Sequence, residues 1–167
     1  MTAVKRVYLD TNVFIMLAEK THETQQRLVA LLAGQPSDSQ PRFATSELTL
    51  SELLVKPYRE QDESLILKYD SLTQPSEWLD LRPVDRDVLY HAAVLRAQYG
   101  HLKLPDAIHL SSAIGQGCSH FLIDDRGIRD SYEVRHHRHD SLPGIATLSV
   151  VHPDEPTLTS LIESLSA

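Results

Sequence analysis

The chain contains a single cysteine, Cys118, among its 167 residues. One thiol can form neither an intrachain disulfide nor a cysteine-based zinc site. No uninterrupted apolar run approaches the roughly 18 residues that a membrane-spanning helix needs. Residues 1–10 also lack the long apolar region and the small-residue cleavage site of a signal peptide. We therefore expect a cytoplasmic protein with no membrane-spanning segment.

Basic residues are outnumbered, and the formal net charge is −7. That charge argues against a protein that grips nucleic acid mainly through a basic surface. It leaves a nucleic-acid enzyme open, because carboxylates loaded with divalent cations present local positive charge on an acidic protein. The apolar share of 41% and the charged share of 23% are those of an ordinary globular protein, and the length suits one domain.

Two familiar catalytic motifs are missing, namely a phosphate-cradling glycine loop and a zinc-protease helix. A phosphatase that works through an aspartyl phosphate would also begin with a strand ending in an aspartate, as this chain does at Asp10. Such an enzyme needs a second aspartate two residues later, where this sequence has Asn12. The remaining chemical signal is therefore the set of acidic residues.

The hydrophobic pattern predicts strands that alternate with helices. Ser46 is a plausible N-cap, Pro57 is expected to end its helix, and Pro105 opens another. Such alternation argues for an α/β fold in which helices cover both faces of a parallel sheet, with sites beyond the carboxyl ends of the strands. The expected strands are 4–9, 42–45, 77–84, 119–124 and 144–151, and the expected helices are 12–20, 21–34, 47–57, 62–74, 85–100, 105–117 and 156–167.

Four acidic residues occupy unusually apolar surroundings: Asp10, Glu52, Asp106 and Asp125. Asp10 and Asp125 follow expected strands, Glu52 lies within a largely apolar helix, and Asp106 follows the helix-starting Pro105. Buried carboxylates are costly unless they are protonated, paired or bound to a metal. Mg²⁺ and Mn²⁺ prefer oxygen ligands of this kind. The alternatives are helix caps at Asp10 or Asp106 and a solvated face at Glu52.

Four segments give the chain a specific resemblance: YLDTNVFI, SELTLSELL, LPDAIHLSSAI and FLIDD. In their order and spacing they resemble the PIN-domain ribonucleases, a family that includes the toxins of VapBC-type toxin–antitoxin pairs. The resemblance covers roughly residues 5–130. It implies a three-layer α/β sandwich around a parallel sheet of about five strands. On this basis residues 1–151 form a single PIN-like nuclease domain, and 152–167 add a C-terminal helical extension of the same domain.

The resemblance also implies a metal site in which Asp10, Glu52, Asp106 and Asp125 hold Mg²⁺ or Mn²⁺. A water would then hydrolyse an RNA phosphodiester without a covalent enzyme intermediate. Asn12 and Ser46 fall at the supporting small polar positions. Asp124 stands where the family often has asparagine, so it could share or replace the role of Asp125. The implied partners are an RNA substrate, an antitoxin protein and a second copy of the chain in a homodimer.

Two further features carry weaker expectations. His109 lies on the same helical face as Asp106 and suits either a packed core histidine or a contact to the site. The run RHHRHD (135–140) is expected to be a solvated loop, with a substrate-phosphate contact as the alternative. At the level of function, the alternatives are a catalytically inactive PIN-like interaction module and a metal-dependent phosphatase or DNA nuclease.

Overall fold

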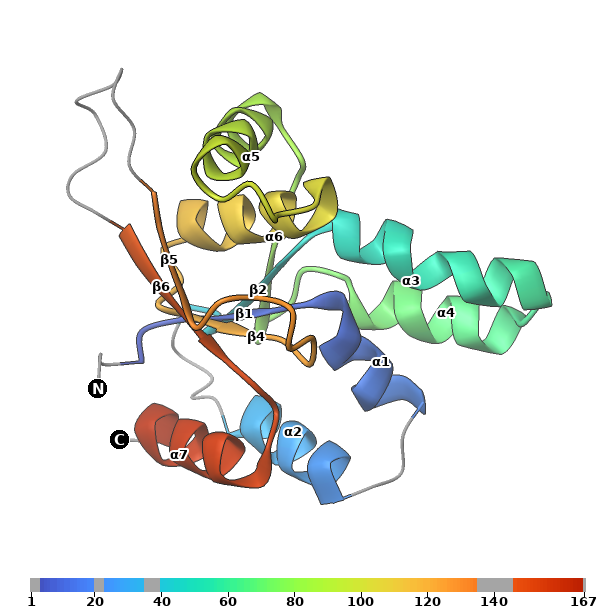
Figure 1. Ribbon diagram of the computed structural model, residues 1–167. Helices are drawn as coiled ribbons and strands as arrows, with labels where there is room; N and C mark the ends of the chain where they lie inside the picture. Colours follow the sequence, from blue (N-terminus) through green and yellow to red (C-terminus); the bar gives the residue numbers. More distant parts are fainter. Residues whose placement is uncertain (1–3, 20–22, 35–39, 135–145, 167) are drawn as a thin grey trace.

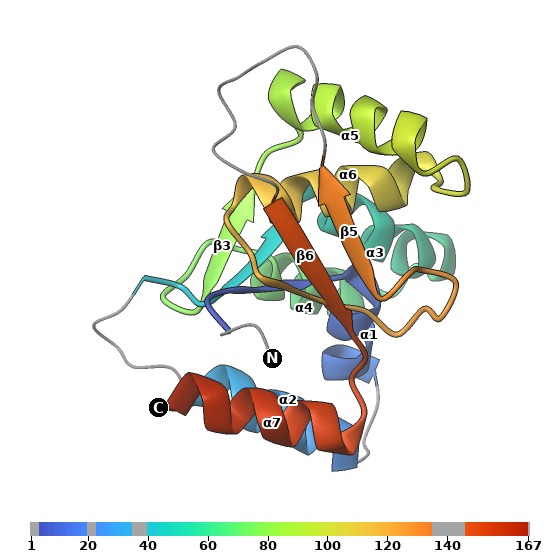
Figure 2. The same cartoon turned by 60° about the vertical axis from the view of Figure 1, so that its left-hand side comes forward.

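A computed structural model describes residues 4–19, 23–34, 40–134 and 146–166 of the chain. Within these ranges six strands form one sheet in the order β3-β2-β1-β4-β6-β5 (Figures 1 and 2). The first five strands of that order run parallel, and β5 pairs with β6 in the antiparallel sense. The strands are β1 (Val7–Leu9), β2 (Phe43–Ser46), β3 (Leu79–Arg82), β4 (His120–Leu122), β5 (Ser131–Val134) and β6 (Ala146–Val151).

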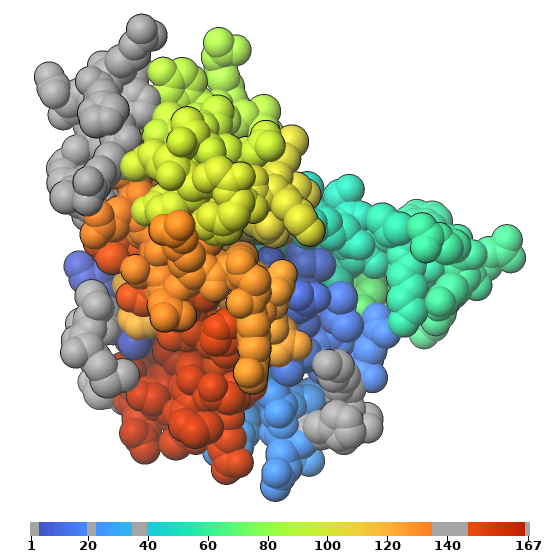
Figure 3. All heavy atoms as spheres, viewed as in Figure 1, coloured from blue at the N-terminus to red at the C-terminus, as the bar shows by residue number. Residues whose placement is uncertain are grey.

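Helices cover both faces of this sheet, as the sequence predicts for a three-layer α/β fold (Figure 1). Helices α5 and α6 lie over one face, whereas α2 and α7 lie over the other. Helices α3 and α4 pack together and project to one side (Figure 3). The helices are α1 (Thr11–Glu19), α2 (Glu23–Ala33), α3 (Glu47–Glu60), α4 (Glu63–Leu72), α5 (Arg86–Gln98), α6 (Leu104–Gly115) and α7 (Glu155–Ser166).

The central strand β1 divides the core between the two faces. Tyr8 packs among residues of α5, α6 and β4, while Val7 and Leu9 pack among residues of α1, α2 and α7. This alternation follows from the two-residue period of a strand. All three residues are fully buried, so β1 is apolar throughout although its side chains point to opposite faces. That pattern is the one expected of a strand covered on both sides.

Two expectations about local structure need correction. The sheet has a sixth strand within the described residues, because Ser131–Val134 forms β5 along the outer edge of β6. Helix α3 also continues through Pro57 for one more turn. Proline removes only its own N–H, so the residues that follow can still bond to earlier carbonyls. The helix ends instead at Glu60, and the left-handed backbone of the cap residue Gln61 (φ 57°) lets the N–H of Asp62 bond to the carbonyl of Pro57 at 2.9 Å.

The order of the strands places two carboxyl ends side by side at the centre of the sheet. From β1 the chain moves outward to β2 and β3, and then crosses back to β4 on the other side of β1. Leu9 therefore pairs with Leu122, and the N–H of Asp10 bonds to the carbonyl of Leu122 at 3.1 Å. Ligand sites of parallel sheets form at such reversals of strand order. Over the part of the chain that is described, no helix is long and apolar enough to cross a membrane.

Candidate metal centre

A hollow of about 250 Å³ lies beyond the carboxyl ends of β1 and β4. Its lining brings together residues of α1, α3 and α6 and of the segment after β4, which are distant in sequence. All four acids that the sequence singled out are among them. The lining residues are Asp10, Thr11, Asn12, Glu52, Asp106, His109, Ile123 and Asp125.

Asp10 is the most deeply buried of these acids, with 8% of its surface exposed. Its position follows from the fully buried strand before it and from α1, which begins at the next residue. Its Oδ2 accepts a long hydrogen bond from the N–H of Asn12 (3.4 Å), and its Oδ1 lies 3.9 Å from Nε2 of His109. Burial raises the pKa of the Asp10 carboxyl, although His109 and the N–H of Asn12 oppose the rise. Asp10 is thus a carboxylate with little local compensation.

Glu52 meets a different environment on α3. Nε2 of His109 lies 2.8 Å from its Oε2, and the hydroxyl of Thr11 donates to the same oxygen. Burial by itself would raise the pKa of Glu52, but the hydrogen bonds from His109 and Thr11 outweigh it and lower that pKa. The structure therefore favours the ionised form of Glu52 at neutral pH.

Asp106 and Asp125 complete the acidic lining. Asp106 lies in the first turn of α6, where the sequence suggests that the helix dipole favours its charged form. Burial instead raises the pKa of Asp106, and the nearby charges of Asp125 and Glu52 add to the rise against His109. Asp125 is exposed at the rim, where its Oδ1 accepts the N–H of Gly127 at 2.8 Å. Asp106 and Asp125 thus line the same hollow, and the charge of Asp125 opposes ionisation of Asp106.

Two predicted supporting residues lie outside this lining. Ser46 is fully buried, and its hydroxyl accepts the N–H of Leu48 at 3.2 Å as the N-cap of α3. Asp124 is exposed and is not among the residues that line the hollow. Thr11 and Ile123 are lining residues that the sequence did not single out, and a threonine that opens a helix gives no distinctive signal. The His-rich run 135–140 lies outside the described residues.

The chemistry of the donors fits a hard divalent cation. Four carboxylates line one hollow, and no ion pair within the described ranges joins any of them to a lysine or arginine. Such a concentration of negative charge is relieved by a cation with oxygen ligands. As the described side chains stand, no three His, Cys, Asp or Glu residues form a ready-made metal cage. The donor set thus suits Mg²⁺ or Mn²⁺, which also retain water ligands.

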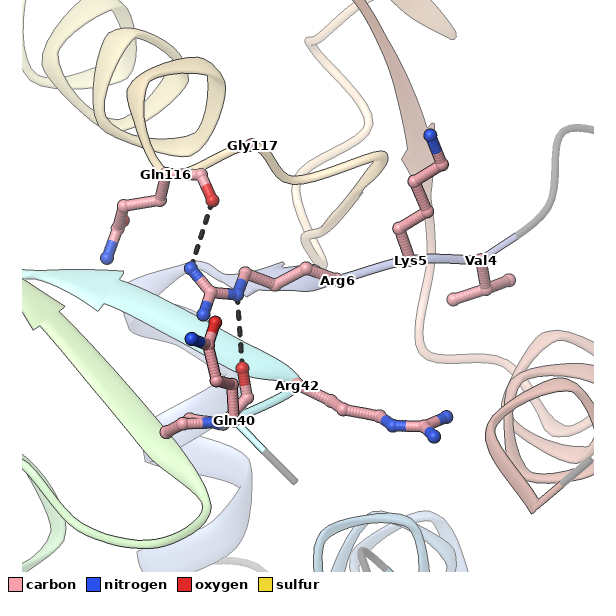
Figure 4. A pocket seen from close by; sticks show the side chains of 8 residues that line it. Val4, Lys5, Arg6, Gln40, Arg42, Gln116 and Gly117 are labelled. Carbon is pink, nitrogen blue, oxygen red and sulfur yellow. Dashed lines mark hydrogen bonds between the residues drawn. The ribbon is translucent and has the colours of Figure 1, made fainter. Parts of the chain in front are cut away.

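A second hollow, of about 550 Å³, lies at the opposite edge of the sheet, where the chain enters β1 and β2 (Figure 4). Its arginines are used to hold the chain together. Arg6 donates to the carbonyls of Pro41 (3.1 Å) and Gln116 (3.0 Å), and Arg42 donates to the carbonyl of Leu165 (2.8 Å). Figure 4 shows the side chain of Arg42 extending away from Arg6. The two guanidinium groups therefore do not converge on one ligand position.

Comparison with known proteins agrees with this architecture. A toxin–antitoxin complex from Klebsiella pneumoniae contains a similar chain, with a TM-score of 0.56 and 23% identity over 89% of this chain and 98% of that one. VapBC2 from Rickettsia felis, bound to a fragment of its promoter DNA, gives a TM-score of 0.56 and 18% identity over 71% and 87%. VapC20 from Mycobacterium tuberculosis, a toxin that cleaves the sarcin–ricin loop, gives 0.55 and 16% over 69% and 86%.

At these identities the similarity to solved structures establishes the fold alone. No curated protein matches the chain in sequence. A family model for the PIN domain matches residues 7–133, which include all four acids of the hollow. The match spans more than half of the sequence and agrees with the six-stranded architecture of the described residues. The chain belongs to the PIN domain family.

Proposed function

We propose that the chain is a divalent-metal-dependent endoribonuclease, the toxin of a type II toxin–antitoxin pair. The observation that carries this proposal is the convergence of Asp10, Glu52, Asp106 and Asp125 on one hollow. Their segments are separated by most of the chain, so the fold has brought them together. Carboxylates gathered without basic partners are suited to hold Mg²⁺ or Mn²⁺.

A bound Mg²⁺ or Mn²⁺ would supply charge stabilisation for in-line attack of water on a phosphodiester. The protein's own part is to hold the acids in distinct states. Glu52 is kept ionised by His109 and Thr11, while Asp10 is withdrawn from solvent at the base of the hollow. Asp125 stands at the exposed rim, where a large substrate has access. No side chain in this arrangement needs to form a covalent intermediate.

The proposed RNA substrate and antitoxin partner rest on the proteins whose structures are similar to this fold. The similar chains described above include a toxin that cleaves the sarcin–ricin loop and members of toxin–antitoxin complexes. We extend this role to the present chain, with a small antitoxin protein as its inhibitor and a homodimer as its own assembly. Co-expression with the product of an adjacent short reading frame tests the pairing, because a cognate antitoxin should co-purify and suppress cleavage.

Cleavage of structured and single-stranded RNA by the purified full chain tests the chemistry. The wild type is compared with Asp10→Asn and Glu52→Gln, each with Mg²⁺, with Mn²⁺ and with a chelator. Glu47→Gln is a matched control, because Glu47 is exposed in the first turn of the same helix as Glu52. We expect cleavage that needs metal, that both site variants abolish and that the control retains.

Cleavage that persists in the chelator and in Asp10→Asn would refute the proposal. Metal-dependent hydrolysis of DNA or of a phosphomonoester, with RNA left intact, would assign the same carboxylates to a different substrate. Stable folding and antitoxin binding without any hydrolysis would identify an interaction module that keeps the fold but not the reaction.

A further inference from the structure

His109 is a buried polar residue in the wall of the hollow. It lies on α6 with 2% of its surface exposed, yet both ring nitrogens meet polar partners. Nε2 lies 2.8 Å from Oε2 of Glu52, and Nδ1 lies 2.7 Å from the hydroxyl of Tyr8. A buried polar side chain with every donor and acceptor engaged fixes one local arrangement. The ring therefore bridges the core of the sheet and one proposed metal ligand.

The partners of His109 determine the hydrogen-bonding roles of its ring nitrogens. An ionised carboxylate only accepts hydrogen bonds, so Nε2 must carry a hydrogen and use it in the hydrogen bond to Glu52. In the tautomer with its hydrogen on Nε2, Nδ1 accepts a hydrogen bond from the hydroxyl of Tyr8. The chain of donors thus runs from Tyr8 through His109 to Glu52.

Tyr8, the first residue in this series of hydrogen bonds, is held rigidly. It is fully buried in β1, and its ring stacks on that of Phe121 in β4 with centroids 5.0 Å apart and planes 8° apart. It also meets the ring of His109 edge-on at 5.8 Å. The hydroxyl is therefore fixed by the two central strands, and Asp10 follows only two residues later. One core element thus positions both Asp10 and, through His109, Glu52.

Glu52 gains its orientation from these contacts. Its side chain is 33% exposed and extends from a helix at the side of the hollow. Among the described residues, His109 and Thr11 both donate to its Oε2. Holding that oxygen leaves Oε1 of the same carboxylate available for a cation. Hydrogen bonds of this kind from outside the ligand set typically change metal affinity by 10–100-fold when removed.

We propose that His109 is a positioning residue of the metal centre: its Nε2–H fixes the carboxylate of Glu52, and the hydroxyl of Tyr8 holds the ring in the orientation that does so. This inference rests on the proposed function, since it assigns a role toward the same divalent cation. On this proposal, a carboxylate of the acidic hollow is oriented by residues of the core rather than by residues at the surface.

Binding of Mn²⁺ to the full-length, metal-free chain tests the proposal by isothermal titration calorimetry. The variants are His109→Leu, which removes the ring donor, and His109→Gln, whose amide N–H can replace Nε2–H. We expect His109→Leu to weaken Mn²⁺ binding by about 10–100-fold. His109→Gln should recover most of that loss. His120→Gln is the matched control, because His120 is a buried histidine (8% exposed) at the other end of β4 that bonds to Ser119.

Nitrogen-15 spectra of the imidazole ring provide a readout that packing alone would not move. The wild type should show a hydrogen on Nε2 of His109, and Tyr8→Phe should shift the resonance of Nδ1 because it removes the hydroxyl 2.7 Å from that nitrogen while it keeps the stack on Phe121. Circular dichroism and thermal unfolding confirm that each variant is folded. A wild-type ring with no hydrogen on Nε2 would overturn the proposed donation to Glu52.

The outcomes separate this proposal from the proposed function. If Asp10→Asn abolishes Mn²⁺ binding but His109→Leu binds as tightly as the wild type, His109 has no positioning role and the metal centre stands. Equal losses in His109→Leu and His109→Gln would also overturn the role, because the restored donor would then be irrelevant. Failure of the wild type to bind Mn²⁺ would refute both proposals.

Discussion

Replacing Asp10 with asparagine should make the thermal stability of the fold independent of divalent metal. The carboxyl is 8% exposed, and burial raises its pKa. An acid whose pKa rises on folding binds its proton more tightly in the folded chain, so stability falls as pH increases from its unfolded to its folded pKa. Above that window the metal-free wild type bears the full cost of a buried charge. We therefore expect metal-free Asp10→Asn to melt at a higher temperature than the metal-free wild type at pH 7.5.

Metal should reverse this order. A ligand that binds only the folded state stabilises it by about 2.7 kcal/mol at 100 times its Kd. In a domain of this size each kcal/mol shifts Tm by roughly 2–4 °C. Mn²⁺ at that ratio should therefore raise the Tm of the wild type by about 5–11 °C. Asp10→Asn lacks one charged oxygen ligand and should remain near its metal-free Tm.

Differential scanning calorimetry with Mn²⁺ and with a chelator measures both effects. Glu47→Gln again serves as the control, since Glu47 is an exposed acid that should not alter the response to metal. An equal rise in Tm for Asp10→Asn and the wild type would show that the cation binds elsewhere. A lower Tm for metal-free Asp10→Asn would refute the argument that its burial is costly.

Three further measurements probe the rest of the structure. Asp125→Asn should weaken the Mn²⁺-induced rise in Tm, whereas Asp124→Asn should preserve it, because only Asp125 lines the hollow. Burial raises the pKa of Cys118 to about 12, so its alkylation at pH 8 should be far slower in the native chain than in urea; equal rates would contradict its burial. Leu158→Ala should cost about 2–5 kcal/mol in urea unfolding with a single transition, because Leu158 is fully buried; Leu67→Ala, 68% exposed, is the control.

The sequence predicted the elements that carry the acids because each has a strong local signature. The apolar run that ends at Asp10 becomes β1, and Pro105 opens α6 just before Asp106. Parallel topology then implies that residues after β1 and β4 meet at one edge. The prediction that α3 ends at Pro57 was wrong because local rules do not register that the proline is buried against the rest of the fold. The four residues of β5 alternate between more exposed and buried positions, but so short a run predicts no strand until its pairing with β6 is known.

The polar partners within the hollow were harder to predict. For His109 the sequence left two interpretations open, a packed core histidine and a contact to the site, because its spacing from Asp106 does not reveal its contact with Tyr8. The contact joins residues 101 positions apart and exists only when β1 and α6 are packed. Thr11 likewise acquires its partner, Glu52, from a helix 41 positions away. Such tertiary hydrogen bonds depend on geometry that no short sequence pattern encodes.

The hollow is assembled from segments around positions 10, 52, 106 and 125. Its four acids come together only after β4 has joined the sheet beside β1, so no amino-terminal fragment that stops before β4 contains the hollow. During synthesis, a ribosome would release most of the chain before that set of acids was complete. A site built in this way cannot form in a nascent chain that stops short of β4. Loss of the fold should therefore remove the site as a whole.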